Sequence, residues 1–156
     1  MNVALLFRRA VLLLVILSIA AFAASERSGW VLVIGGLLAV AATRITDGPR
    51  KRHLPAWAIR FGVFVGIGWG AVQFMARPSP DEAPRIVAYV VLGALLLKLW
   101  DRKTPSDWRQ VMALSIVLVV ASALASGDFL VGVLVIGYAV ATIATTMLYH
   151  LHAGAA

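Results

Sequence analysis

Residues 11–24 read VLLLVILSIAAFAA and residues 31–42 read VLVIGGLLAVAA, and neither stretch contains a charged residue. Both are apolar on every face, whereas a strand of a membrane barrel alternates apolar and polar residues. An open sheet would leave unpaired backbone groups in lipid, so helices are the remaining structure that can span a membrane. The two stretches therefore predict an α-helical membrane protein.

The composition of the whole chain agrees with this prediction. Of its 156 residues, 62% are hydrophobic and 13% are charged. In a soluble domain roughly half of the residues are hydrophobic and about a quarter are charged. A soluble fold of this composition would expose large apolar patches. The net charge of +7 arises from residues at the ends of apolar runs, which indicates membrane topology and argues against a nucleic-acid partner. The absence of cysteine excludes disulfides, thiolate metal sites and a cysteine nucleophile.

Apolar runs recur from one end of the chain to the other, and six of them are interpreted as spanning helices. We expect an all-α, polytopic helix bundle that forms a single membrane domain over residues 1–156. Several runs are short for a hydrocarbon core of about 30 Å, so side chains at their ends should reach the interface. The predicted helices cover residues 10–24, 30–43, 57–76, 86–99, 108–125 and 129–150.

The connections contain ordinary helix-start signals. Ser79-Pro80-Asp81-Glu82 is interpreted as an N-cap followed by proline at the first helical position and an acid. Thr104-Pro105-Ser106-Asp107 has the same pattern and predicts a capping box. Asp128 is expected to cap the last helix.

Lysine and arginine are distributed unequally between the loops, which predicts that both termini are cytoplasmic. Arg27, Arg77 and Arg85 are the cations of the opposite side. Localisation in the bacterial cytoplasmic (inner) membrane follows. The cations expected to contact lipid headgroups and set topology are Arg8, Arg9, Arg50, Lys51, Arg52, Arg102 and Lys103. Residues 8–23 also resemble a signal peptide, but the next apolar run follows so closely that we expect the segment to be retained as half of a helical hairpin.

Small residues form stripes on two of the predicted helices. Gly62, Gly66 and Gly70 are spaced four residues apart, which allows a neighbouring helix to approach closely. A similar stripe lies on the last helix at Gly137, Ala141 and Thr145. We hypothesise that the two stripes contact each other; the first could equally face a partner chain.

The sequence offers no credible catalytic constellation, metal site or cofactor site. Intramembrane acids, which ion carriers normally need, are absent from the apolar runs. His53, His150 and His152 are expected at the interface or surface. The strongest polar groups within the runs are expected to bond backbone carbonyls or neighbouring helices, and they are Gln73, Ser115, Ser122, Thr142 and Thr145.

The second half of the chain also carries a recognisable pattern over residues 92–151. A Lys-Leu helix end precedes a short charged loop, a Leu-Ser helix and a Tyr-bearing helix that closes on His-Leu. The positions are Lys98, Leu99, Asp107, Gln110, Leu114, Ser115, Tyr138, His150 and Leu151. This pattern resembles the N-terminal membrane domain of the bacterial transglutaminase-like TgpA family.

Members of that family generally continue into a further membrane helix and an extracytoplasmic transglutaminase-like domain with a Cys/His/Asp site. This chain contains no cysteine, so none of those catalytic residues can be assigned to it. The resemblance therefore implies the membrane part alone. We expect a non-catalytic membrane anchor or scaffold that contacts membrane lipids and other membrane protein subunits. An accessory subunit of an energy-transducing or photosynthetic complex is the main alternative, and a small transporter or channel is a weaker one.

Overall fold

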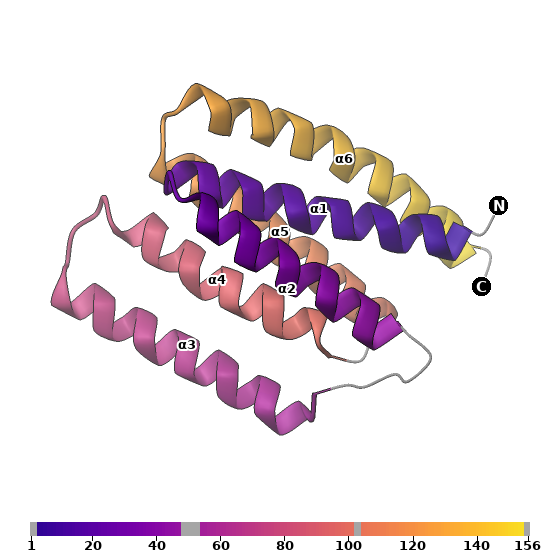
Figure 1. The fold of residues 1–156 in the computed structure, drawn as a ribbon, viewed down its shortest axis with the longest axis horizontal. Coiled ribbons are helices and arrows are strands. Elements are labelled where there is room, and N and C mark those ends of the chain that lie inside the picture. Colours follow the sequence, from indigo (N-terminus) through magenta and orange to yellow (C-terminus); the bar gives the residue numbers. More distant parts are fainter. Residues whose placement is uncertain (1–2, 48–53, 102–103, 155–156) are drawn as a thin grey trace.

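The computed structural model describes residues 3–47, 54–101 and 104–154. Within these residues the chain forms six α-helices and no strand. The helices run side by side in one bundle, and the two termini lie at the same end of it (Figure 1). In chain order the helices are α1 (Val3–Ser25), α2 (Gly29–Asp47), α3 (Ala56–Ala76), α4 (Ala83–Leu99), α5 (Pro105–Ala125) and α6 (Phe129–Gly154).

Helix α1 lies in the middle of the bundle and contacts α2, α5 and α6 (Figure 1). Helix α4 packs against α5, α3 and α2. Helix α3 lies at the edge and packs on α4, on the far side of the bundle from α6 (Figure 1). The expected contact between the small-residue stripes of α3 and α6 is therefore not made. Each stripe belongs to a helix at an opposite edge, with α1 and α4 between them.

The core follows the length of α1. Residues three or four apart share one helix face, and Phe7, Val11, Val15, Ile19 and Phe22 are all buried in the main apolar cluster. At the end of this row that lies near the termini, the Phe7 ring meets the Trp108 ring edge-on, with centroids 5.6 Å apart. Helix α1 therefore forms the centre of the apolar core.

Several helices extend beyond the predicted apolar runs. Helix α1 begins at Val3, so Arg8 and Arg9 lie within it, and α2 continues past Arg44 to Asp47. The predicted ranges end where the first charged residues occur, and this marks the limit of the apolar segment rather than the end of the helix. Arginine is a good helix former, so it does not end the helix itself.

The start of α5 confirms the predicted capping box. The Thr104 hydroxyl accepts a hydrogen bond from the Asp107 N–H (3.3 Å), and the Asp107 carboxylate accepts one from the Thr104 N–H (2.8 Å). Asp128 precedes α6, and its carbonyl accepts the Gly132 N–H (3.2 Å). Its carboxylate pairs with Arg27.

The predicted start of the fourth helix is wrong. Helix α4 begins at Ala83, with Glu82 at the N-cap position and Pro84 in its first turn. Ser79 belongs to a preceding turn in which its carbonyl accepts the Glu82 N–H (3.2 Å). If the helix began at Pro80, Pro84 would lie at its fifth position, where proline clashes with the carbonyl four residues earlier. The first turn is the place where a helix tolerates proline.

The turn between α1 and α2 is closed by backbone bonds from Arg27 to Ala24 (3.1 Å) and from Ser28 to Ala23 (2.9 Å). This is the pattern of a Schellman motif. Its left-handed position, usually glycine, is Arg27 with φ 52°. The tight turn makes α1 and α2 a helical hairpin.

Helix length and composition identify a multi-pass membrane protein. Five of the described helices are long and apolar enough to cross a membrane, and α4 is slightly shorter at 17 residues. Large apolar side chains cover the outward face of α3 and include Trp57, Phe61, Val72 and Met75. In water these would form an apolar patch of a size that monomeric proteins avoid, whereas in lipid they are normally solvated.

Candidate functional site

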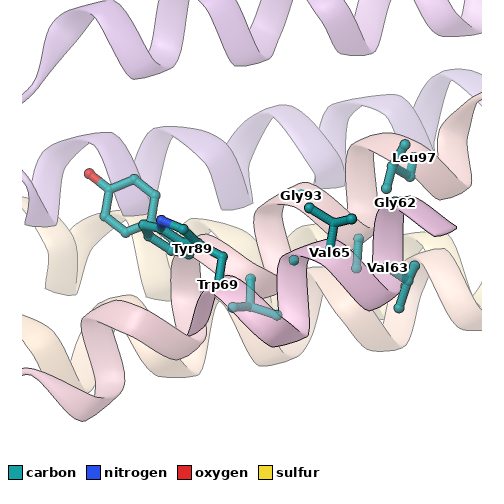
Figure 2. Close-up of a pocket in the computed structure, with 10 residues that line it drawn as sticks. Gly62, Val63, Val65, Trp69, Tyr89, Gly93 and Leu97 are labelled. Atoms are coloured by element: carbon teal, nitrogen blue, oxygen red, sulfur yellow. The ribbon is translucent and has the colours of Figure 1, made fainter. Parts of the chain in front are cut away.

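A groove of about 300 Å³ runs between α3 and α4. Glycines from both helices, Gly62 and Gly66 on α3 and Gly93 on α4, form part of its lining. Figure 2 shows Trp69 beside Tyr89 at one end of the groove and Gly62 beside Leu97 at the other. The lining is largely apolar, so the groove suits hydrocarbon rather than a charged substrate.

The glycines of α3 have different surroundings. A Cβ added at Gly62 would lie 2.7 Å from Leu97 Cδ1, and one at Gly70 would lie 2.7 Å from Val90 Cγ2. A Cβ at Gly66 would meet no atom within 4 Å. The stripe predicted from sequence thus lies against α4 at its two ends, while its middle position borders the groove.

The small-residue stripe of α6 is placed differently. Thr145 is buried, and its hydroxyl donates to the Ala141 carbonyl (2.7 Å). Ala141 packs against the second apolar cluster, which contains Leu14 of α1. Gly137 is exposed, and a Cβ there would meet no atom within 4 Å. Of the stripe, Ala141 therefore packs towards α1, while Gly137 lies outside the contact.

Three side chains form a polar cluster at the end of the bundle opposite the termini. Arg85 Nε and Nη2 lie 2.8 and 2.6 Å from Glu26 Oε2, and the Tyr89 hydroxyl donates to the same oxygen (3.1 Å). The Glu26 side chain is 5% exposed. The Tyr89 ring also packs edge-on against Phe22, with centroids 4.8 Å apart. This Glu26 cluster fastens the α1–α2 turn to the start of α4.

The Glu26 cluster was missed in the sequence because its partners are 59 and 63 residues away along the chain. A second, exposed pair joins Arg27 to Asp128 across 3.3 Å at the same end. The Glu26 cluster and the Arg27–Asp128 pair bring together the α1–α2 turn, the start of α4 and the α5–α6 connection. The count of lysine and arginine assigned these three regions to one side of the membrane.

A second ion cluster lies at the opposite end of α4. Lys98 Nζ lies 2.9 Å from Asp101 Oδ2 and 2.7 Å from Asp107 Oδ1. Asp107 is also the N3 residue of the α5 capping box, so one carboxylate both stabilises the start of α5 and ties it to α4. This Lys98 cluster fixes the turn between the two helices.

Four of the five polar groups expected to bond backbone carbonyls or neighbouring helices do so. Ser122, Thr142 and Thr145 donate to carbonyls four residues earlier in their own helices. The Ser115 hydroxyl lies 2.6 Å from the Tyr138 hydroxyl and so links α5 to α6. Gln73 is half-buried in α3.

The remaining predicted residues that the structure describes lie near the chain termini, on α1 and α6. Arg8 and Arg9 are exposed on α1, and His150 is exposed on α6 with its ring 6.0 Å from that of Tyr149. Within the described residues no group of three or more His, Cys, Asp or Glu side chains could hold a metal ion. The predicted positions outside the described residues are Arg50, Lys51, Arg52, His53, Arg102 and Lys103, and the His152 side chain is likewise not described.

The residues that carry the family resemblance form pairs in space. Lys98 contacts Asp107, and Ser115 contacts Tyr138. One pair joins α4 to α5 and the other joins α5 to α6. The pattern therefore describes how the last three helices are joined.

Comparison with known proteins agrees with the resemblance. A family model described as the TgpA N-terminal domain matches residues 10–156. No curated protein and no solved structure matches the chain. Because the match covers almost the whole sequence and all six helices, the chain belongs to the TgpA N-terminal domain family.

Proposed function

We propose that this chain is a non-catalytic membrane scaffold that holds a partner membrane protein through helix–helix contacts. The observation that carries the proposal is the asymmetry of the bundle. Of the residues in the apolar window of α1, 44% are buried, against 11% for α3. A helix with one neighbour and an open outer face has room for a second neighbour.

The outward stripe of α3 consists of exposed residues at spacings of three, four or seven, which share one helix face: Trp57, Phe61, Gly68, Val72 and Met75. A Cβ at Gly68 would meet no atom within 4 Å, so the backbone is accessible there. Membrane helices associate through small residues and close packing. Aromatic side chains beside an open glycine suit such a contact.

In the proposed orientation, all six helices cross the bacterial inner membrane and both termini are cytoplasmic. The lysine and arginine bias between the loops supports this. Helix α4, at 17 residues, is about 26 Å long, close to the lower limit for a span. The Lys98 cluster and the Glu26 cluster at its two ends would then lie at the two interfaces.

A photo-crosslinking amino acid placed at Val72 tests the proposal in native membranes. The matched control is Ile143, an apolar position of similar exposure on α6 (64% and 61%). We expect a discrete protein adduct from position 72 and lipid adducts from position 143. Lipid adducts alone from both positions would contradict the scaffold role. If the adduct contains cofactor-bearing subunits in fixed stoichiometry, the accessory-subunit alternative replaces it.

A further inference from the structure

A second groove adjoins the one in Figure 2 on the other side of the α3–α4 contact, and Val63 and Ala94 line both. Helix α4 packs against both α3 and α5, and the groove lies between these two flanking helices. Its volume is about 390 Å³, which is within the range of roughly 300–1,000 Å³ typical of small-molecule sites. Ala94 contributes a small side chain from α4, while Val63, Ile67 and Leu114 line the walls.

One end of this α3–α4–α5 groove is polar. Arg60, Lys98 and Gln110 line it there, each within two turns of a helix end on the side of the bundle that carries the termini. Ile67 lies seven residues further along α3 than Arg60, which is about 10 Å deeper. The groove thus has a polar mouth at interface level and an apolar interior, as an amphiphile with one charged end requires.

The two cations at the mouth differ in their partners. The Lys98 ammonium is held by Asp101 and Asp107, and neither acid lines the groove. Arg60 is exposed and makes no ion pair or side-chain hydrogen bond to any described residue. A guanidinium presents several N–H donors in a planar fork that matches phosphate oxygens. Arg60 is therefore the group available for an anion.

We propose that the α3–α4–α5 groove binds an anionic phospholipid, with one acyl chain along Ala94 and Ile67 and the phosphate on Arg60. Gln110 lines the same end of the groove, and an amide can donate a further hydrogen bond to the headgroup. The occupant is lipid rather than a soluble phosphate because most of the lining is apolar. Basic pockets between membrane helices recognise anionic headgroups in this way.

Native mass spectrometry of the detergent-solubilised chain, titrated with phosphatidylglycerol or phosphatidylcholine of equal chain length, tests the site. For Arg60→Gln we expect about fivefold weaker phosphatidylglycerol binding and a smaller loss of phosphatidylcholine binding, because the choline cation offsets the phosphate charge that Arg60 would attract. The control is Arg44→Gln, which removes an exposed arginine at the same end of the bundle, outside the groove. Arg44→Gln should bind both lipids as the parent chain does.

A second variant, Ala94→Leu, fills the groove without changing its charge and should weaken the binding of both lipids. Circular dichroism and gel filtration identify any variant that fails to fold, and Ala94→Ser then takes its place with a smaller loss of the same kind. Equal losses from Arg60→Gln and Arg44→Gln would overturn the site. So would unchanged binding by the folded Ala94 variant, or displacement of the lipid by millimolar inorganic phosphate.

Discussion

Helices α1 and α3 have nearly the same length and are both largely apolar, yet α1 lies at the centre of the bundle and α3 at its edge. Helix α1 has no glycine and is enclosed by three other helices, whereas α3 has four glycines and packs on one. In a soluble protein the polar face of a helix would show which side is buried. Neither helix has one, because lipid accepts apolar side chains as readily as the core does.

The difference between the two helices lies in how they pack. Helix α1 fills the core with Phe, Leu, Val and Ile side chains. Helix α3 brings its backbone close to α4 at Gly62 and Gly70 and leaves large side chains pointing outward. Glycine content therefore marks a close pairwise contact and does not mark the centre of the bundle.

The largest effect should come from truncating the same residue type in both helices. Phe22→Ala in α1 removes a fully buried ring that packs on Tyr89, and we expect a loss of about 3 kcal/mol in unfolding free energy from the cavity. Phe61→Ala in α3 removes a ring that is 65% exposed and should change stability by less than about 0.5 kcal/mol. Unfolding in mixed micelles with increasing dodecyl sulfate measures both. Equal losses would refute the central position of α1.

The next largest effect on stability should come from replacing one of two glycines of α3, Gly70 or Gly66, with alanine. In Gly70→Ala the new methyl group meets a Val90 methyl group, and valine is stiff at χ1, so we expect a loss of about 2 kcal/mol. Gly66→Ala enters open space and should be neutral or slightly stabilising, since alanine is the better helix former. The same unfolding titration distinguishes them. A destabilised Gly66→Ala variant would mean that α3 has a neighbour at that position.

The Glu26 cluster should contribute less, because Arg85 is half exposed. In Glu26→Ala we expect the free energy of unfolding to fall by about 1 kcal/mol. Breaking a fully buried ion pair would cost more, but solvent screens the exposed part of this one. The exposed Arg27–Asp128 pair is the comparison, and Asp128→Asn should cost at most about 0.5 kcal/mol. Unfolding titrations of both variants test this order. If Asp128→Asn costs more than Glu26→Ala, the Glu26 carboxylate does not fasten the α1–α2 turn.

The smallest of the four main effects should come from the hydroxyl pair that joins α5 to α6, Ser115 and Tyr138. A double-mutant cycle of Ser115→Ala and Tyr138→Phe should give an interaction energy of about 0.6 kcal/mol, the average for such bonds in membrane proteins. Ser122→Ala provides the control, because that hydroxyl bonds its own helix. A cycle with no interaction energy would show that the 2.6 Å contact does not join the helices.

Much of this fold could be predicted because apolar runs define the membrane helices almost directly. The capping box at Thr104 was also readable, since both of its residues lie within one turn. Apart from the α1–α2 hairpin, the neighbours of each helix could not be predicted, because α1 and α3 look alike to any hydrophobicity pattern. The partners of Glu26 and Lys98 depend on that arrangement. The start of α4 was misplaced because two prolines competed for one position, and only Pro84 suits the helix that forms.

The membrane crossing of α4, α5 and α6 is tested most directly by single cysteines, since the chain contains none. Ser79 lies in the α3–α4 connection and Gly154 at the end of α6, with the short helix α4 and two longer helices between them. Ser79→Cys should react with a membrane-impermeant maleimide in intact spheroplasts. Gly154→Cys should react with the same reagent only after the membrane has been permeabilised. Labelling of both positions from the same side would contradict the account, because it would mean that an even number of helices crosses between them.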